Sequence, residues 1–475
     1  MKAFITALLN RRVNILNLPL LIKIIAIVFS AAFLIALAVR KPGLSGFFEK
    51  AGLFGIFLFA LFIPIKDGFA VFGMVAAIIF FIAYKIAERD ISLPKTGFNI
   101  PLLIYAAIVL SSFIWTYSLK NSLNEGGEIF YFILFFFAAA GLLTTVKRIK
   151  FMVYTFTFSI CAAIIYGFFQ GIFINALHSQ NRLTGPIGNW VGFPVQVSYG
   201  LIVITAYYLL DFKKRNEKGG ISFVGIIPKA ASGVFFGFIL LLGFFDIAFA
   251  KARSAWLGII PAIFVLMYLK SKKLFFAAVI LLLLLNIGIF SVSKTFKSRI
   301  FSMFNPKIYR LELKNHGDIE SHIALIESAW AVFKRFPLTG VGVGAFSKYF
   351  DAHKGVRFPW YYNPKTGKKI YDLYDDWPEN GYMQALAETG IFGFAALMWL
   401  FFLALKNPVK LFIGSRDIFI RKIAAITIGT SIIFYGSFAG VSNMSNDELA
   451  NLWLFFLALS AAAGLLPEAG RKSFG

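Results

Sequence analysis

Long apolar runs separated by short polar turns occupy most of the chain. Many runs hold about 18 or more residues with few charges, the length at which an α-helix crosses the hydrocarbon core of a bilayer. The two-residue alternation of a transmembrane β-barrel is absent. The pattern therefore predicts an all-α, polytopic integral membrane protein. The predicted apolar segments are 20–39, 51–65, 68–86, 99–117, 127–145, 149–171, 193–211, 232–250, 252–270, 273–292, 385–405, 419–440 and 447–466.

The composition supports a membrane protein and changes how the net positive charge is interpreted. Of the 475 residues, 59% are hydrophobic and 58 are Phe, more apolar surface than a soluble chain of this length can bury. The net charge of +24 would suggest nucleic-acid binding in a soluble protein. Here the basic residues lie in short loops, where they set membrane orientation, so we expect no nucleic-acid partner. A smaller share of them is available for anionic lipid or a diphosphate.

The basic loops also predict which face each loop occupies. Sequences such as VKRIK at 146–150 and YLKSKK at 268–273 alternate with loops that carry few positive charges. Basic loops favour the cytoplasmic side, which also places the C-terminus inside. The loops expected on the opposite, periplasmic face are 118–127, 172–191, 251–253 and 293–384.

About twelve spans, starting near Ala51, satisfy this rule for every later loop. Segment 20–39 either adds a thirteenth span, which would place the basic N-terminus outside, or lies in the membrane interface. No cleavable signal peptide is evident. Cys161, the single cysteine, excludes an intrachain disulfide. The predicted organisation is an N-terminal segment 1–50, a transmembrane core 51–292, a large periplasmic loop 293–384 and C-terminal transmembrane helices 385–475.

Two outer stretches place cations at the membrane boundary. HSQNRLTGPIGNW, at 178–190, contains Arg182, and AKARSAWLG, at 250–258, contains Lys251 and Arg253. An arginine at this depth is costly unless it snorkels or has an anionic partner, and its planar guanidinium suits phosphate oxygens. These residues are therefore either a phosphate clamp or ordinary interfacial arginines.

The long loop, at about 90 residues, exceeds the usual length of a passive connector and is expected to be functional. Its segment FPLTGVGVGAF, at 336–346, carries Gly340 and Gly342. Such glycines let backbone N–H groups approach an anion, but the Lys and Ser/Thr of a phosphate-binding loop are missing. The alternative is a turn packed on membrane helices.

The end of the loop carries acids and the loop carries histidines. Asp372, Asp375, Asp376 and Glu379 would share one helical face and could hold a divalent cation. Alternatively, Pro378 starts a helix whose N-terminus favours nearby acids. The histidines that could act as a base near neutral pH, or could simply be solvated, are His316, His322, His353 and His178.

Four segments, in this order, carry a resemblance: NRLTGPIGNW, ARSAWLG, PLTGVGVGAF and ENGYMQALAETGIFG. From about residue 51 to the last span, the chain resembles the O-antigen ligases and O-antigen polymerases of bacterial envelopes. The resemblance implies a glycosyltransferase in the inner membrane, with its active site facing the periplasm. It implies an undecaprenyl-diphosphate-linked glycan as donor and no nucleotide sugar, metal or other cofactor. The ligases of the family carry a histidine where this chain has Glu379.

The resemblance also implies roles for residues of this chain. Arg182 and Arg253 are expected to hold the diphosphate and stabilise its charge as it leaves. The family's histidine is the residue assigned to activating the acceptor hydroxyl, and Glu379, which stands in its place, is expected to take the proton instead. A carboxylate can serve as such a base if desolvation raises its pKa. The alternative bases are His322, His353 and His316. The residues expected to bind substrate are Lys251, Asn380, Tyr382, Gln384, Gly340 and Gly342, with helix support and cavity lining as the alternative role of Gln384.

The acceptor stays open at this stage. A ligase would transfer the glycan to lipid A–core, whereas a polymerase would extend a lipid-linked chain and work beside a flippase and a chain-length regulator. We favour the ligase description, with the polymerase as the alternative. A lipid-linked oligosaccharide transporter and a metal-dependent transferase built on the acidic cluster are more distant alternatives. Membrane lipid is a partner under every description.

Overall fold

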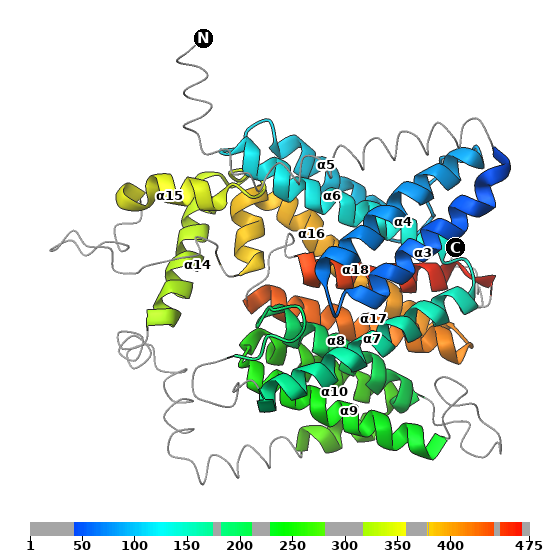
Figure 1. The fold of residues 1–475 in the computed structure, drawn as a ribbon. Coiled ribbons are helices and arrows are strands. Elements are labelled where there is room, and N and C mark those ends of the chain that lie inside the picture. Colours follow the sequence, from blue (N-terminus) through cyan, green and yellow to red (C-terminus); the bar gives the residue numbers. More distant parts are fainter. Residues whose placement is uncertain are drawn as a thin grey trace, which may run out of the picture.

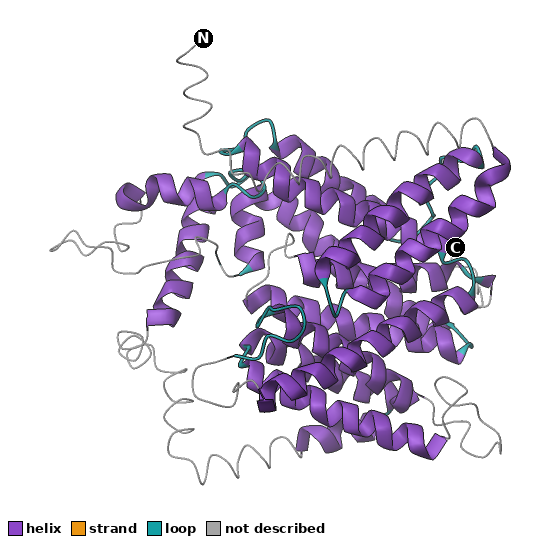
Figure 2. Cartoon of the chain, in the orientation of Figure 1, coloured by secondary structure: helices purple, strands orange, loops and turns teal. Residues whose placement is uncertain are grey.

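The computed structural model describes residues 42–173, 182–210, 229–280, 317–357, 378, 380–440 and 447–467. This part of the chain is helical and contains no strand (Figure 2). The elements are η1 (Pro42–Leu44), α3 (Ser45–Phe62), α4 (Asp67–Ala87), α5 (Asn99–Ser112), α6 (Leu119–Leu142), α7 (Val146–Phe173), α8 (Gly192–Leu210), α9 (Lys229–Ala250), α10 (Arg253–Lys270), α14 (Gly317–Arg335), α15 (Phe346–Arg357), α16 (Gly381–Gly414), α17 (Ile418–Gly440) and α18 (Asp447–Leu465).

Eight of these helices are long and apolar enough to cross a membrane: α3, α4, α6, α7, α8, α9, α16 and α17. Three shorter apolar helices accompany them, in α5, α10 and α18. The all-α, polytopic class predicted from the apolar runs is therefore confirmed. Segment 20–39 and most of 273–292 lie outside the described residues, so the total of twelve or thirteen spans stays a prediction.

Glycines allow two helix pairs to pack backbone against backbone. In α3 and α4, a Cβ on Gly55 would lie 2.7 Å from the carbonyl oxygen of Gly73. In α10 and α17, a Cβ on Gly436 would lie 2.7 Å from the backbone nitrogen of Gly258. Within a bilayer, where lipid is as apolar as the side chains, this close van der Waals approach drives helix association.

The centre of the bundle is aromatic. Trp453 of α18 is fully buried and stacks on Phe434 of α17, with ring centroids 4.5 Å apart. Its indole nitrogen donates to Ser431 Oγ at 3.0 Å, so the polar atom of the ring is satisfied. The part of α16 after the break at Gly390 packs against the same cluster through Phe401, 5.4 Å from the Trp453 ring.

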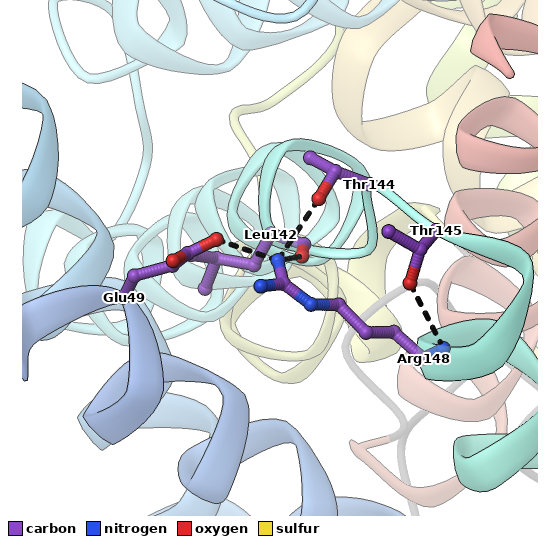
Figure 3. Close-up of polar contacts among 5 residues, drawn as sticks. All are labelled: Glu49, Leu142, Thr144, Thr145 and Arg148. Atoms are coloured by element: carbon purple, nitrogen blue, oxygen red, sulfur yellow. Dashed lines mark hydrogen bonds and ion pairs between the residues drawn. The ribbon is translucent and has the colours of Figure 1, made fainter. Parts of the chain in front are cut away.

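One end of the bundle is held by an arginine (Figure 3). Nη1 of Arg148, in the first turn of α7, lies 2.5 Å from Glu49 Oε1 of α3 and 2.9 Å from the carbonyl oxygen of Leu142. It also donates to Thr144 Oγ1 at 2.9 Å. Arg148 therefore satisfies a carbonyl at the end of α6, which the helix itself leaves free, and joins three helices. The end of the bundle that contains Arg148 is the end at which the basic loops lie.

The long loop contributes α14 and α15, which lie beside the opposite end of the bundle, at the left of Figure 1. They share a second, smaller apolar core with α16. Its buried members are Leu325, Ala329, Val332, Val341, Ala345, Phe346, Tyr349, Phe350 and Ala387. The described part of the loop is thus an ordered helical layer over one end of the membrane helices.

Candidate functional site

The glycine strap, residues 336–346, packs into a break in α16. Gly390 interrupts this helix with φ 63° and ψ −165°, a conformation that is essentially restricted to glycine. The N–H of Ile391, just after the break, donates to the carbonyl of Pro337 at 2.8 Å. A Cβ on Gly390 would collide with the carbonyl oxygen of Leu338. The break and the strap are therefore complementary backbone surfaces.

Two further backbone hydrogen bonds join the strap to the helix. Val341 N donates to Ala387 O at 3.0 Å, and Gly342 N donates to Glu388 O at 2.9 Å. Gly340 has φ +65°, and a Cβ there would collide with the backbone of Glu388. A membrane segment must satisfy its backbone N–H and C=O groups within the protein. At the break, where regular helical hydrogen bonds are missing, the backbone of the strap supplies the partners.

The other side of the strap contacts the turn between α5 and α6. Tyr117 N donates to Val341 O at 2.9 Å, and Trp115 Nε1 donates to Thr339 O at 3.2 Å. The hydroxyl of Ser122 donates to the carbonyl of Val343. The strap therefore ties α5 and α6 to α16.

These contacts bear on the expected anion-binding role of the glycines. Gly340 N donates to Phe336 O at 3.0 Å, and Gly342 N is used by Glu388 O. In this conformation, both N–H groups are satisfied inside the protein. The geometry matches the alternative interpretation, a turn packed on membrane helices, and substrate binding by Gly340 and Gly342 stays a prediction.

Glu388 is the centre of this arrangement. Its carboxylate is 5% exposed and accepts from Phe346 N, 3.4 Å from Oε1, and from the N–H of Gly344. Gln384 donates to the same Oε1 at 3.3 Å. Gln384 and Glu388 also line a small cavity together with Glu125 of α6. The segment ETGIFG, residues 388–393, thus has a structural role, because it holds the strap.

The mouth of α16 is capped by Asn380. Its Oδ1 accepts from Met383 N at 3.1 Å, and its Nδ2 donates to the carbonyl of Ala439, at the end of α17, at 2.8 Å. The expectation that Pro378 starts the helix is wrong, because the helix begins at Gly381 after this cap. Glu379 lies outside the described residues, between Pro378 and the cap.

Tyr382 holds the start of α16 against the side of α17. Its hydroxyl donates to the carbonyl of Tyr435 at 3.2 Å, and its ring lies 4.9 Å from that of Phe438 in edge-on contact. Asn380 and Tyr382, both expected to bind substrate, therefore each contact α17. Their contact with substrate stays a prediction.

Arg182 begins a turn that precedes α8. The turn is held from α7 by Gln170, which donates to Thr184 Oγ1 at 3.0 Å and accepts from Gly185 N at 2.8 Å. Arg182 is exposed, and its guanidinium carbon lies 3.8 Å from the centroid of the Trp190 ring. This cation–π contact keeps the charge at the surface without an acidic partner among the described residues.

The second cationic segment lies beside this turn. Leu183 N is 3.5 Å from the carbonyl oxygen of Phe249, in the last turn of α9. Lys251 follows with φ +57° and an exposed side chain, and Arg253 is the first residue of α10. Among the described residues, no side chain caps the start of α10, so its first backbone N–H groups have no side-chain acceptor there. The segments of Arg182, Lys251 and Arg253 are thus brought together, although they are about 70 residues apart in the chain.

The α16 mouth and the start of α10 are neighbours through α17. Asn380 contacts Ala439, and Gly436, one turn deeper, packs on Gly258. Arg253 lies five residues before Gly258, or about 7 Å further out along α10. The cationic segments and the capped mouth therefore stand at the same end of the bundle.

Sequence analysis missed a group of buried polar residues near this end. Gln196 of α8, Ser254 of α10, Ser437 of α17 and Asn451 of α18 are buried and have side-chain atoms without a hydrogen-bond partner among the described residues. Each lies in an outer turn of its helix. Unpaired polar atoms in a membrane segment are costly, so each of these atoms calls for a partner such as water, a polar ligand or a residue outside the described ranges. The sequence signal that could have identified these residues is a single polar residue within an apolar run.

Asp246 of α9 was also missed. It is fully buried, and neither carboxylate oxygen has a hydrogen-bond partner among the described residues. A Cβ on Gly167 would lie 2.7 Å from its Oδ2 and 2.7 Å from the ring of Phe193. The lone acid in LLLGFFDIAFA was visible in the sequence.

The remaining candidates are placed only in part. His322 lies in α14 and His353 in α15, both in the helical layer over the outer end. His316, His178 and the acids Asp372, Asp375 and Asp376 lie outside the described residues. Within the described ranges, no group of three His, Cys, Asp or Glu could hold a metal ion.

A comparison with known families gives a match to part of the chain. Residues 236–398 match the model of a family described as O-antigen ligase. The matched stretch contains α10 with Arg253, the glycine strap and the mouth of α16, but not Arg182. A comparison with curated proteins found no match.

Proposed function

We propose that the chain is a membrane glycosyltransferase of the O-antigen ligase and polymerase family, a proposal supported by the match of residues 236–398 to the O-antigen ligase model. It moves a glycan from an undecaprenyl-diphosphate donor to an acceptor hydroxyl at the periplasmic face of the inner membrane. The observation that carries the proposal is the meeting of two cationic segments and a capped helix mouth at one end of the bundle. α14 and α15 lie beside that end, next to the start of α16 (Figure 1).

The cationic segments form the donor site of this proposal. Arg182 and Arg253 bind the diphosphate through charge-assisted hydrogen bonds, and Lys251 adds a third positive charge. The uncapped start of α10 supports an anion here, because the N-terminus of a helix carries partial positive charge. As the bond between the sugar and the diphosphate breaks, these groups stabilise the charge that develops on the leaving phosphate.

Glu379 is the proposed base. It directly precedes Asn380, the cap of α16, so the sequence keeps it at the helix mouth. A single displacement requires a group that takes the proton from the acceptor hydroxyl as that oxygen attacks the anomeric carbon. His322 and His353 are the alternatives on the covering helices, and His316 directly precedes α14 in the sequence.

The α14–α15 layer is the proposed acceptor platform. It is fixed to the membrane helices by the strap, so it can position a sugar chain over the mouth of α16. A ligase acting on lipid A–core and a polymerase acting on a lipid-linked chain differ only in what this layer holds. The family's ligases carry a histidine at the position of Glu379, and this difference gives the polymerase weight as the second candidate.

A transfer assay with purified protein in liposomes tests the donor site. The probe is an undecaprenyl-diphosphate-linked glycan, and the variants are Arg253→Ala and Arg416→Ala. Arg416 is an exposed arginine in the turn between α16 and α17, at the opposite end of α16 from the proposed site. Removing a charge clamp on the leaving group should lower transfer at least about a hundredfold in Arg253→Ala. Arg416→Ala should match wild type, and normal transfer by Arg253→Ala would remove the clamp.

A further inference from the structure

A groove on the lipid-facing side of the bundle lies between α3 and α7, away from the proposed site. Its volume is about 450 Å³, within the range of roughly 300–1,000 Å³ found for small-molecule sites. Its apolar walls are Leu53, Phe54, Phe57, Phe151 and Met152, and its accessible lining is apolar. Lys147 and Arg148 complete the lining.

The phenylalanines give the groove flat, open walls. Phe57 of α3 stacks on Phe151 of α7 at 5.6 Å with an interplanar angle of 18°, and Phe54 stacks on Phe57 at 5.9 Å. Phe54 is 59% exposed and Phe151 is 53% exposed. Both lie on candidate membrane spans, so we expect their exposed faces to meet the apolar interior of the bilayer.

The groove has a defined top and bottom. At the top, Arg148 joins α7 to Glu49 of α3, as Figure 3 shows. Deeper in the membrane, the hydroxyl of Ser159 in α7 donates to the carbonyl of Leu61 in α3. The two helices are therefore joined by a polar contact on each side of the groove. These contacts fix the spacing of the helices and so the width of the groove.

The top of the groove carries net positive charge. Lys147 is exposed and makes no ion pair among the described residues. Arg148 uses Nη1 for Glu49, Leu142 and Thr144, which leaves Nε and Nη2 without a partner in the described part of the chain. Two cations face one acid, and guanidinium and ammonium donors remain available for phosphate oxygens.

The groove has positive charge at one end and apolar walls along the rest, an order that complements the anionic headgroup and the acyl chains of a phospholipid. The donors lie in the first turn of α7, where the span enters the membrane, and the phenylalanine walls follow one to two turns deeper. Lys150 of α7 lies 5.0 Å from the ring of Phe419 at the start of α17, so the turn before α17, with the exposed Arg416, is at the same end. Basic pockets between transmembrane helices on the cytoplasmic side suit anionic headgroups.

We propose that this groove, the α3–α7 groove, is a specific site for an anionic phospholipid of the leaflet that meets the basic loops. Lys147 and the free donors of Arg148 bind the headgroup phosphate, and one acyl chain lies against Phe54, Phe57 and Phe151. A zwitterionic headgroup brings its own cation toward Lys147 and binds less well. The site does not depend on the proposed glycan transfer.

Native mass spectrometry of the full-length protein in mild detergent tests the site. The delipidated protein is titrated with phosphatidylglycerol and with phosphatidylethanolamine of the same acyl chains. The variants are Lys147→Gln and, as matched control, Lys50→Gln, an exposed lysine of α3 at the same end that does not line the groove. Thermal unfolding of each variant checks that it is folded. Arg148 is left intact because it holds three helices.

Wild type should bind phosphatidylglycerol more tightly than phosphatidylethanolamine. Lys147→Gln should lower the affinity for phosphatidylglycerol about fivefold, the effect of one interfacial lysine, and leave phosphatidylethanolamine unchanged. Lys50→Gln should behave as wild type. Equal binding of the two lipids, or unchanged binding by Lys147→Gln, would overturn the proposal. So would the absence of any bound lipid, which would mean that detergent, residues 1–41 or a second copy of the chain fills the groove.

Discussion

The carboxylate of Glu388 accepts a hydrogen bond from the backbone N–H of Phe346, 3.4 Å from Oε1 and 42 residues earlier in the chain. This contact joins the mouth of a membrane helix to the first residue of α15, so the membrane core and the covering layer are one structure. The backbone bonds of Val341 and Gly342 with α16 surround it. The geometry of the proposed site depends on this junction.

Replacing Glu388 tests the junction. Glu388→Leu should lower the free energy of unfolding by about 2 kcal/mol, because the N–H groups of Gly344 and Phe346 would lose their buried acceptor. Glu388→Gln keeps a carbonyl acceptor of the same size and should lose less than half as much. Thermal unfolding in detergent measures both. Equal loss in the two variants would show that charge, and not the acceptor, holds the strap.

The break in α16 predicts a strong glycine requirement. Gly390→Ala should destabilise the protein by at least about 2 kcal/mol, from the strained backbone alone, before the collision with Leu338 is counted. Gly414, the last residue of the same helix, has nothing within 4 Å of an added Cβ. Gly414→Ala should therefore leave unfolding unchanged. A mild effect of Gly390→Ala would mean that the helix can straighten and release the strap.

Asn380 has two separable contacts. Asn380→Asp keeps the acceptor for Met383 N and loses the donor to Ala439, whereas Asn380→Ala loses both. Loss of an N-cap costs about 1 kcal/mol, so Asn380→Ala should be the less stable variant in thermal unfolding. If the tie to α17 positions the mouth for catalysis, transfer should fall in both variants alike. Full transfer by Asn380→Asp would show that this tie is dispensable.

Asp246 should tolerate loss of its charge. Its carboxylate has no hydrogen-bond partner among the described residues, so Asp246→Asn removes no observed contact. The amide also costs less to bury than a carboxylate. The melting temperature of Asp246→Asn should equal or exceed that of wild type. A drop of several degrees would reveal a partner for the carboxylate beyond the described residues.

The sequence predicted the fold class well because the bilayer imposes a long apolar signal on each span. It placed the apolar segment at 385–405 and offered Pro378 as a helix start, whereas α16 begins at Gly381. The apolar segment began too late because Gln384 and Glu388 lower the apolarity of a turn that is buried against the strap. The break at Gly390 could not be predicted, since it depends on a strap about 50 residues earlier in the chain. Glycine spacing alone does not reveal which backbone packs against it.

The candidate site stays a prediction, although several of its features were visible in the sequence. Arg182 and Arg253 were visible as cations at span boundaries, and the structure brings their segments together. The glycines of the strap indicated that its backbone makes close contacts. In the structure, that backbone forms hydrogen bonds with α16. Buried Ser254 and Ser437 were hidden because a serine in an apolar run is common and only its lack of a partner makes it notable. The roles of Glu379 and His316 stay predictions.

The most direct test of the account is a reconstituted transfer assay. Purified protein in liposomes receives undecaprenyl-diphosphate-linked glycan, with and without lipid A–core, and wild type is compared with Glu379→Gln. The account predicts a glycan product with wild type, on lipid A–core for a ligase or as longer lipid-linked chains for a polymerase. It also predicts a loss of about a hundredfold or more in Glu379→Gln, since general acid–base groups contribute roughly 10²–10⁴-fold. Absence of any product with both acceptors would contradict the proposed glycosyltransferase, and full activity of Glu379→Gln would contradict its proposed base.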